Sequence, residues 1–202
     1  NSCYVFSATA ALEAHNSIVN DVSKPVSEQE IIDCSRENDG CTGGQPYLVY
    51  DYIIKNGLSY DNSYPYIARE GTCKARSLSN SLNRFTGLKG YIFPKPGMLN
   101  LLKALQYGPV SVVMYASQEF KYYYDGIYEG KGCAGDETPN HSAVVYGYNL
   151  NAPKPYLLLK NGWGADWGED GHFKVAIGRL SNDNTGHCYI AKTKYNVLPV
   201  MR

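Results

Sequence analysis

Residues 1–15 read NSCYVFSATAALEAH, which places a cysteine near the start of a run of good helix formers. The run continues without proline or glycine and predicts a helix from Ser2 to Val19 with Asn1 or Ser2 as its N-cap. Cys3 then lies in the first turn, where backbone N–H groups and the helix dipole favour the thiolate. Three roles are open for Cys3: half of a disulfide, a small core residue, or a nucleophile. Residues elsewhere in the sequence are needed to distinguish between them.

The composition limits the class of protein. A chain of 202 residues can build one sizeable core or two packed lobes. Its net charge of zero gives no reason to expect binding to nucleic acid or to an anionic membrane. No apolar run approaches the roughly 20 residues that a membrane span needs. The six cysteines form no CxxC pair and the four histidines no ligand-like spacing, so we expect disulfides from an oxidising compartment, no metal and no cofactor.

Further helices are predicted in the first half of the chain. The capping box S-x-x-E formed by Ser27 and Glu30 opens a second helix. A third helix is predicted over Pro46–Lys55, with proline in its first turn and Gly57 just after its end. A short fourth helix is predicted over Met98–Tyr107.

The second half has the patterns of β-strands. Five segments alternate or run apolar over strand lengths: VSVVMYA, SAVVYGYN, YLLLK, HFKVAI and YIAKTKY. Helices followed by strands predict an α+β fold. We expect one domain of two lobes, with residues 1–90 mainly helical and residues 91–202 rich in strands.

Candidate partners for a nucleophilic cysteine lie in the β-rich half. A thiol nucleophile needs a base, and the base needs an orienting group. His141 starts the segment HSAVVYGY, and Asn161 follows the segment YLLLK. If the two strands adjoin, this imidazole and this carboxamide meet at matching strand ends.

A series of motifs then occurs in a fixed order along the whole chain: Ser2-Cys3-Tyr4, SEQEIIDC, GCTGG, YPY, GPVSV, NHSAVVYGY and KNGWGADWGEDG. His141 follows Cys3 by 138 residues (141 − 3) and Asn161 follows it by 158 (161 − 3). In these features the chain resembles the papain-like cysteine peptidases. The resemblance implies a two-lobe fold, a helical left lobe and an antiparallel, β-barrel-like right lobe, with the active site in a cleft between them.

The resemblance also implies a catalytic role for each of four residues. Cys3 would be the nucleophile, held as a thiolate by imidazolium His141. Asn161 would orient the imidazole, and Trp163 would shield their hydrogen bond from water. The implied reaction is the hydrolysis of internal peptide bonds through an acyl-enzyme intermediate.

Substrate-binding positions follow from the same resemblance. The backbone of Gly43 and Gly44 would bind an extended peptide, Asn140 would offer its carbonyl, and Trp163 and Trp167 would wall the leaving-group side. The pocket for the second residue before the scissile bond (P2) would be lined by Gln45, Pro46, Val113, Pro139, Ser142 and Thr193. These residues are small, neutral or apolar, so we expect a hydrophobic P2 residue. Two glycines also suit a plain turn and two tryptophans a plain core, and these alternatives stay open.

The cysteines are assigned by the same likeness. It implies the disulfides Cys34–Cys73 and Cys133–Cys188, and it leaves Cys3 free. Cys41 would pair with a cysteine upstream of Asn1. Family members carry roughly twenty more mature residues there, including an oxyanion-binding glutamine. We therefore expect this chain to be the mature domain without that segment.

The binding partners, the location and the alternative functions of the protein can also be stated as expectations. The resemblance implies peptide or protein substrates, an inhibitory propeptide, cystatin-type inhibitors, a monomer, and a lysosomal or secreted location. The main alternative is a catalytically impaired homologue that acts as a binding protein, which the retention of Cys3, His141 and Asn161 disfavours. A different Cys-His acyl-transfer enzyme, such as a transglutaminase, is disfavoured by the GCTGG and GWGADWG segments.

Overall fold

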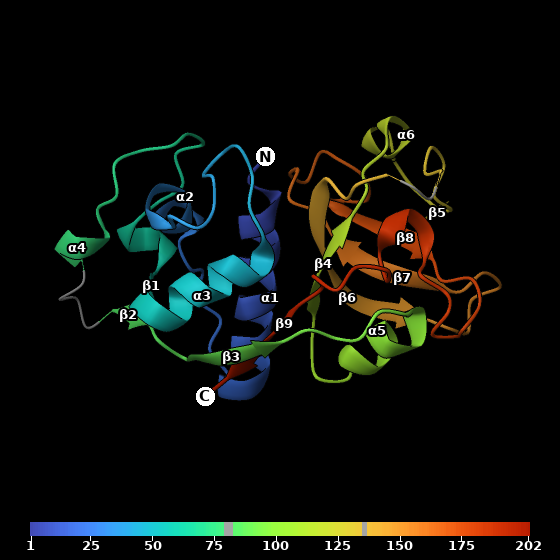
Figure 1. Cartoon of the computed structure of the whole chain (residues 1–202), viewed down its shortest axis with the longest axis horizontal. Helices are drawn as coiled ribbons and strands as arrows, with labels where there is room; N and C mark the ends of the chain where they lie inside the picture. The colour runs from blue at the N-terminus through green and yellow to red at the C-terminus, as the bar shows by residue number, and fades with distance from the viewer. Residues whose placement is uncertain (79–82, 135–136) are drawn as a thin grey trace. The chain divides into compact units, whose positions relative to one another are not determined.

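The computed structural model describes residues 1–78, 83–134 and 137–202 (Figure 1). The chain divides into two compact units, one formed by residues 1–92 with 199–202 and the other by residues 93–198. Within the described ranges, no helix combines the length and apolar character that crossing a bilayer requires.

The first unit is mainly helical. Its elements are α1 (Cys3–Asn20), α2 (Glu28–Cys34), α3 (Pro46–Asn56), β1 (Leu58–Ser59), the 3-10 helix η1 (Asp61–Ser63), α4 (Ala75–Leu78), β2 (Arg84–Phe85) and β3 (Leu88–Ile92). On α1 the buried Val5, Ala8 and Leu12 recur at helical spacing, so they form one apolar face. α1 packs against α2 and α3, and β1 pairs antiparallel with β2. The predicted first helix is confirmed, although the N-cap Ser2 makes no side-chain capping bond.

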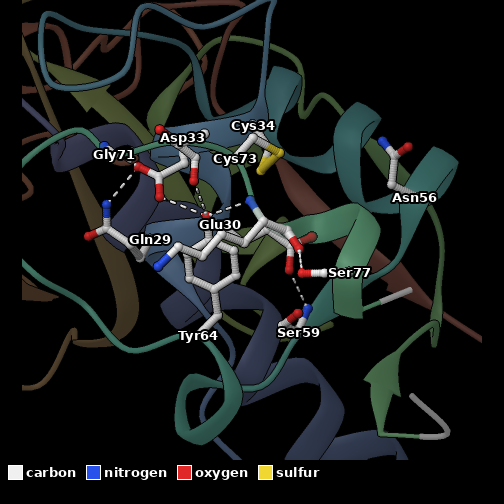
Figure 2. Close-up of a disulfide and its surroundings, with 12 residues drawn as sticks. Gln29, Glu30, Asp33, Cys34, Asn56, Ser59, Tyr64, Gly71, Cys73 and Ser77 are labelled. Carbon is white, nitrogen blue, oxygen red and sulfur yellow. Dashed lines mark hydrogen bonds between the residues drawn. A yellow bond between two sulfur atoms is a disulfide. The ribbon is translucent and has the colours of Figure 1, made fainter. Parts of the chain in front are cut away.

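Only one of the two hydrogen bonds of the predicted capping box of α2 forms. Ser27 accepts a hydrogen bond from the backbone N–H of Glu30, as predicted. The side chain of Glu30 does not return to Ser27, because the N–H of Ser27 is already bonded to the carbonyl of Ser59 at 2.9 Å. Instead Glu30, which is fully buried, accepts a hydrogen bond from the N–H of Ser59 (Figure 2). It also pairs with Arg84 at 2.7 Å and accepts from the hydroxyl of Tyr52. Glu30, which the sequence pattern predicted as a capping residue, therefore forms a buried ion pair with Arg84 instead.

A disulfide and a carboxylate attach the long loop after η1 to α2. Cys34 and Cys73 form the disulfide that the family resemblance implies. The preceding residue of α2, Asp33, accepts hydrogen bonds from the N–H of Gly71 at 2.7 Å and from the hydroxyl of Tyr64 at 2.7 Å (Figure 2). The loop therefore has defined anchors although it contains little regular structure.

The second unit is built on a five-stranded sheet. Its elements are α5 (Met98–Ala104), β4 (Val110–Met114), α6 (Gln118–Lys121), β5 (Ile127–Tyr128), β6 (His141–Asn149), β7 (Tyr156–Lys160), β8 (His172–Ala176), the 3-10 helix η2 (His187–Tyr189) and the start of β9 (Leu198–Met201), which pairs with β3. The strand order is β4-β6-β7-β8-β5. The pairs among β4, β6, β7 and β8 are antiparallel, as expected for this lobe, but β5 runs parallel to β8. The chain between β5 and β8 contains the β6–β7 hairpin, which provides the crossover that a parallel pair needs.

Alternate residues of this sheet form the core of the second unit. Ala143 and Val145 of β6, Leu157 and Leu159 of β7 and Phe173 of β8 are all buried in one apolar cluster. Successive side chains of a strand point to opposite faces, so this face of the sheet is the core face.

One predicted strand is wrong. The segment YIAKTKY, residues 189–195, forms the end of η2 and a series of turns. Cys188 and Tyr189 have positive φ angles of 52° and 69°, which an extended strand does not allow. Cys188 is bonded to Cys133 in the second implied disulfide, and Ile190 is fully buried in the core. The apolar residues of this segment therefore serve packing rather than strand pairing.

Candidate active site

His141 and Asn161 meet at the ends of two neighbouring strands in the second unit. His141 is the first residue of β6, and Asn161 directly follows β7, the antiparallel partner of β6. Both continue the core face of the sheet, because His141 precedes Ala143 by two residues and Asn161 follows Leu159 by two. His141 Nε2 lies 2.8 Å from Asn161 Oδ1, and both residues are buried.

The backbone fixes which atoms of this pair are donors. The N–H of Gly162 lies 2.8 Å from Asn161 Oδ1, so that atom must be the acceptor oxygen. An acceptor at Oδ1 requires the hydrogen of neutral His141 to be on Nε2. Nδ1 therefore carries the free lone pair of the neutral ring. The amide nitrogen of Asn161 is buried with no partner among the described residues, so the two contacts of Oδ1 set the orientation of the side chain.

Burial keeps the imidazole neutral when no anion faces it. It lowers the pKa of His141 from 6.5 to about 4, and the hydrogen bond to Asn161 offsets only part of this shift. The neutral ring therefore leaves Nδ1 unprotonated, with a lone pair that can accept a hydrogen bond or a proton.

Aromatic side chains enclose the histidine. The ring of Trp163 lies 4.7 Å from the imidazole, centroid to centroid, and Trp167 lies 5.1 Å from Trp163. Phe120 of α6 is fully buried and contacts His141, Trp163 and Trp167 at 6.2, 5.6 and 5.2 Å. Phe120 was not among the sequence candidates, since only the aromatic-rich run FKYYY at 120–124 hinted at this packing.

The first unit holds the candidate nucleophile at the start of α1. Cys3 is partly buried, and it is one of two free cysteines in the described part of the chain, with Cys41. The next residue, Tyr4, is buried and its hydroxyl donates to the carbonyl of Gly40 at 2.9 Å. The first turn of α1 is thereby tied to the turn that leads into Gly43 and Gly44.

The two glycines have different surroundings. A Cβ on Gly44 would lie 2.3 Å from Asn38 Oδ1 and 2.6 Å from the ring of Tyr4, whereas a Cβ on Gly43 would meet nothing within 4 Å. Asn38 cannot easily move away, because its Oδ1 accepts the N–H of Gln45 at 2.9 Å. Close packing thus explains Gly44, and it gives no reason for glycine at Gly43.

This difference predicts the effect of substituting each glycine. Gly44→Ala is expected to lower the free energy of unfolding by about 1–3 kcal/mol, because Asn38 and Tyr4 must shift. Gly43→Ala, its matched control, is expected to change the free energy by less than about 0.5 kcal/mol. Urea unfolding of both variants measures the difference. Equal losses would contradict the packing account of Gly44.

The other predicted residues of the first unit lie at the start of α3. Gln45 is the N-cap of this helix and Pro46 its first residue. Pro46 is buried, while Gln45 is partly exposed. They directly continue the Gly43–Gly44 segment.

The predicted substrate-binding residues of the second unit lie partly on one face of the sheet and partly in loops. Val113 of β4 and Ser142 of β6 are directly opposite each other on the face away from the core, and both are buried. Asn140, just after Pro139, binds the N–H of Ala116 at 2.8 Å through its side chain. The last of the set, Thr193, lies in the turns after η2.

Comparison with known proteins relates the whole chain to one family. A family model described as papain family cysteine protease matches residues 1–198. The chain is 36% identical to caricain from Carica papaya over 195 residues, which are 96% of this chain and 54% of that protein. It is 39% identical to the probable cysteine protease RDL4 of Arabidopsis thaliana over 193 residues, 94% of this chain and 51% of that protein. The chain thus spans about half the length of these curated relatives.

Solved structures show the same likeness. The bromelain protease from Ananas comosus, solved in complex with the E64 inhibitor, has a TM-score of 0.85 and 32% identity, covering 100% of this chain and 89% of that one. The cysteine protease Amb a 11, a ragweed pollen allergen solved in its proform, has a TM-score of 0.83 and 31% identity, covering 100% of this chain and 59% of that one. Both matches include both units, so the predicted α+β fold is confirmed.

Proposed function

Because the chain belongs to the papain family of cysteine proteases, we propose that it is a thiol-dependent endopeptidase in which Cys3, His141 and Asn161 carry out catalysis. The observation that carries this proposal is the 2.8 Å hydrogen bond between His141 Nε2 and Asn161 Oδ1. With its hydrogen on Nε2, the imidazole has Nδ1 available as a base for a thiol. The family's active cleft would bring Cys3 of the first unit to that nitrogen.

The proposed chemistry transfers an acyl group to sulfur and then to water. The thiolate of Cys3 attacks the scissile carbonyl carbon, and the carbonyl π electrons move to oxygen as the C–S bond forms. When the carbonyl re-forms, the C–N bond breaks and the leaving nitrogen takes the proton from His141 Nδ1. Water then attacks the thioester, gives a proton to Nδ1, and the C–S bond breaks to restore the thiolate.

Features of the proposed site would stabilise the thiolate of Cys3, the oxyanion of the intermediate and the imidazolium of His141. The 18-residue helix α1 begins at Cys3, so the residue stands at the end of the helix where the dipole favours negative charge. The N–H of Cys3 would also donate to the oxyanion of the tetrahedral intermediate. A thiolate facing Nδ1 would oppose the effect of burial on the pKa of His141, because an anion stabilises the imidazolium.

Substrate binding is proposed for the residues that match the family's subsites. Gly43 has open space around its Cα, so its backbone can be approached by an extended peptide that adds as a strand. The set that includes Pro46, Val113 and Ser142 is small, neutral or apolar and carries no charge, which favours an apolar P2 side chain. Trp163 and Trp167 would contact the residues after the scissile bond.

The proposal is tested with the full-length protein and a thiol-directed peptidyl epoxide. We expect one adduct, at Cys3, located by peptide mass spectrometry. A peptide with leucine at P2 should be cleaved at least about tenfold more efficiently, in kcat/KM, than one with arginine there. Cleavage that prefers arginine would contradict the P2 proposal alone. No adduct and no cleavage would contradict the peptidase and favour a binding protein.

Synthesis as an inhibited precursor in the endomembrane system is part of the same proposal. A related structure is described as a proform, and one relative, 36% identical, is named a KDEL-tailed cysteine endopeptidase. The two disulfides suit an oxidising compartment, lysosomal, vacuolar or extracellular.

A further inference from the structure

The loop between β7 and β8, residues 161–171, carries three residues of the proposed site: Asn161, Trp163 and Trp167. We propose that Glu169, within this loop, is a positioning residue that holds these three side chains in their working arrangement. The inference rests on the proposed function, because it assigns Glu169 a role in the same reaction.

The backbone of the loop folds back on itself. The N–H of Asn161 donates to the carbonyl of Gly171 at 2.9 Å, and the N–H of Gly171 donates to the carbonyl of Trp167 at 2.8 Å. Asp170 has a φ of 53°, a left-handed conformation that is costly for a residue with a side chain. A loop with such a residue needs support from its surroundings to keep one conformation.

Glu169 supplies that support through three groups outside the loop. Its Oε1 accepts the N–H of Gly126 at 3.0 Å and lies 2.8 Å from the hydroxyl of Tyr123. Its Oε2 pairs with Lys174 Nζ of β8 at 2.8 Å. The carboxylate thus joins the loop to the segment after α6 and to the neighbouring strand.

The charge state of Glu169 suits this role. Partial burial acts to raise the pKa of Glu169, but the hydrogen bonds from Lys174 and Tyr123 outweigh it and hold the pKa below its ordinary value. The carboxylate therefore remains an ionised acceptor at neutral and mildly acidic pH, and charge-assisted bonds of this kind are the stronger ones.

A continuous series of ring contacts links this anchor to the catalytic histidine. The ring of Tyr123, whose hydroxyl Glu169 holds, lies 5.5 Å from Trp167. Trp167 lies 5.1 Å from Trp163, and Trp163 lies 4.7 Å from His141. Loss of the anchor would free the loop that sets the position of Asn161 and, through it, the imidazole.

Steady-state kinetics test the positioning role. Glu169→Ala in the full-length protein is expected to lower kcat for a short peptide substrate by roughly tenfold or more, because small displacements of catalytic groups are costly. KM should change by less than about twofold, since Glu169 is not proposed to touch the substrate. Glu169→Gln keeps an oxygen acceptor for Tyr123 and Gly126, so it should recover most of the lost kcat.

Tryptophan fluorescence gives a readout that is independent of activity. The sequence contains two tryptophans, and both lie in this loop. Glu169→Ala should shift the emission maximum to longer wavelength, because the indoles gain contact with water. Glu129→Ala, which removes an exposed carboxylate paired with Lys154 in the same unit, is the matched control and should change neither kcat nor emission.

The Glu169 variants distinguish a positioning role from a structural one. If Glu169→Ala fails to fold, Tyr123→Phe tests the same contact, because it removes only the hydroxyl, and it should lower kcat in the same direction. Wild-type kcat and emission in the folded variants would overturn the inference. If the wild-type protein hydrolyses no peptide, the proposed function fails, and an emission shift restricted to the Glu169 variant would still establish the anchor.

Discussion

Replacing Cys3 by alanine is expected to abolish peptide hydrolysis, with a loss in kcat of roughly 10³-fold or more, because no acyl-enzyme can form without the sulfur. The variant should also lose its adduct with a peptidyl epoxide. Its melting temperature should stay close to that of the wild type, since Cys3 is only partly buried and carries no disulfide. Hydrolysis of a fluorogenic peptide by the full-length protein, with mass spectrometry of the adduct, measures both effects.

Cys41→Ser is the control for this experiment. Cys41 is the other cysteine without a disulfide among the described residues, and its N–H bonds to Glu70. In the full-length protein the family resemblance pairs its sulfur with an upstream cysteine, so Cys41 has no proposed role in the reaction. The variant should keep most of the activity and the adduct at Cys3. Activity that survives in Cys3→Ala, or that is lost equally in both variants, would show that Cys3 is not the nucleophile.

Replacing His141 by glutamine is expected to lower kcat by about 10³-fold, because the thiolate loses its proton donor and acceptor. His172→Gln is a matched control, since His172 is the first residue of β8 as His141 is of β6. The control should keep activity within about threefold. Equal losses in the two variants would remove His141 from the mechanism.

The same histidine predicts a pH dependence of stability that is best seen without the thiolate, in Cys3→Ala. Burial lowers the pKa of folded His141 from 6.5 to about 4. Above pH 6.5 the ring is neutral in both states and contributes nothing. As the pH falls from 6.5 to 4, only the unfolded chain takes up the proton, so the free energy of unfolding decreases by about 3 kcal/mol in total.

Urea unfolding at pH 7 and pH 4 measures this loss. Adding His141→Gln to Cys3→Ala should remove it, because glutamine does not titrate. Wild-type protein should lose less than Cys3→Ala if the thiolate faces the imidazole and stabilises its charge. Equal losses in all three proteins would contradict both the burial effect and the proposed ion pair.

Local patterns in the sequence predicted most elements correctly. Tyr156–Lys160 is a strand at the predicted residues, and Pro46 opens α3 as expected, because apolar spacing and proline act within a few residues. The failure at 189–195 has the opposite cause. A disulfide at Cys188 and two positive φ angles decide that segment, and neither is visible in its apolar pattern.

The sequence by itself determined the chemistry available to this protein: a thiol at the start of a long helix, an imidazole and a carboxamide at adjoining strand ends, and the spacing that relates them to one family. Only the tertiary structure decided that Gly162 fixes the tautomer of His141, that Glu30 pairs with Arg84, that Phe120 packs on Trp167, and that Glu169 accepts a hydrogen bond from Gly126. These contacts join residues that are far apart in the chain or compete for one atom. A local pattern carries no information about such partners, because only the folded chain brings them within bonding distance.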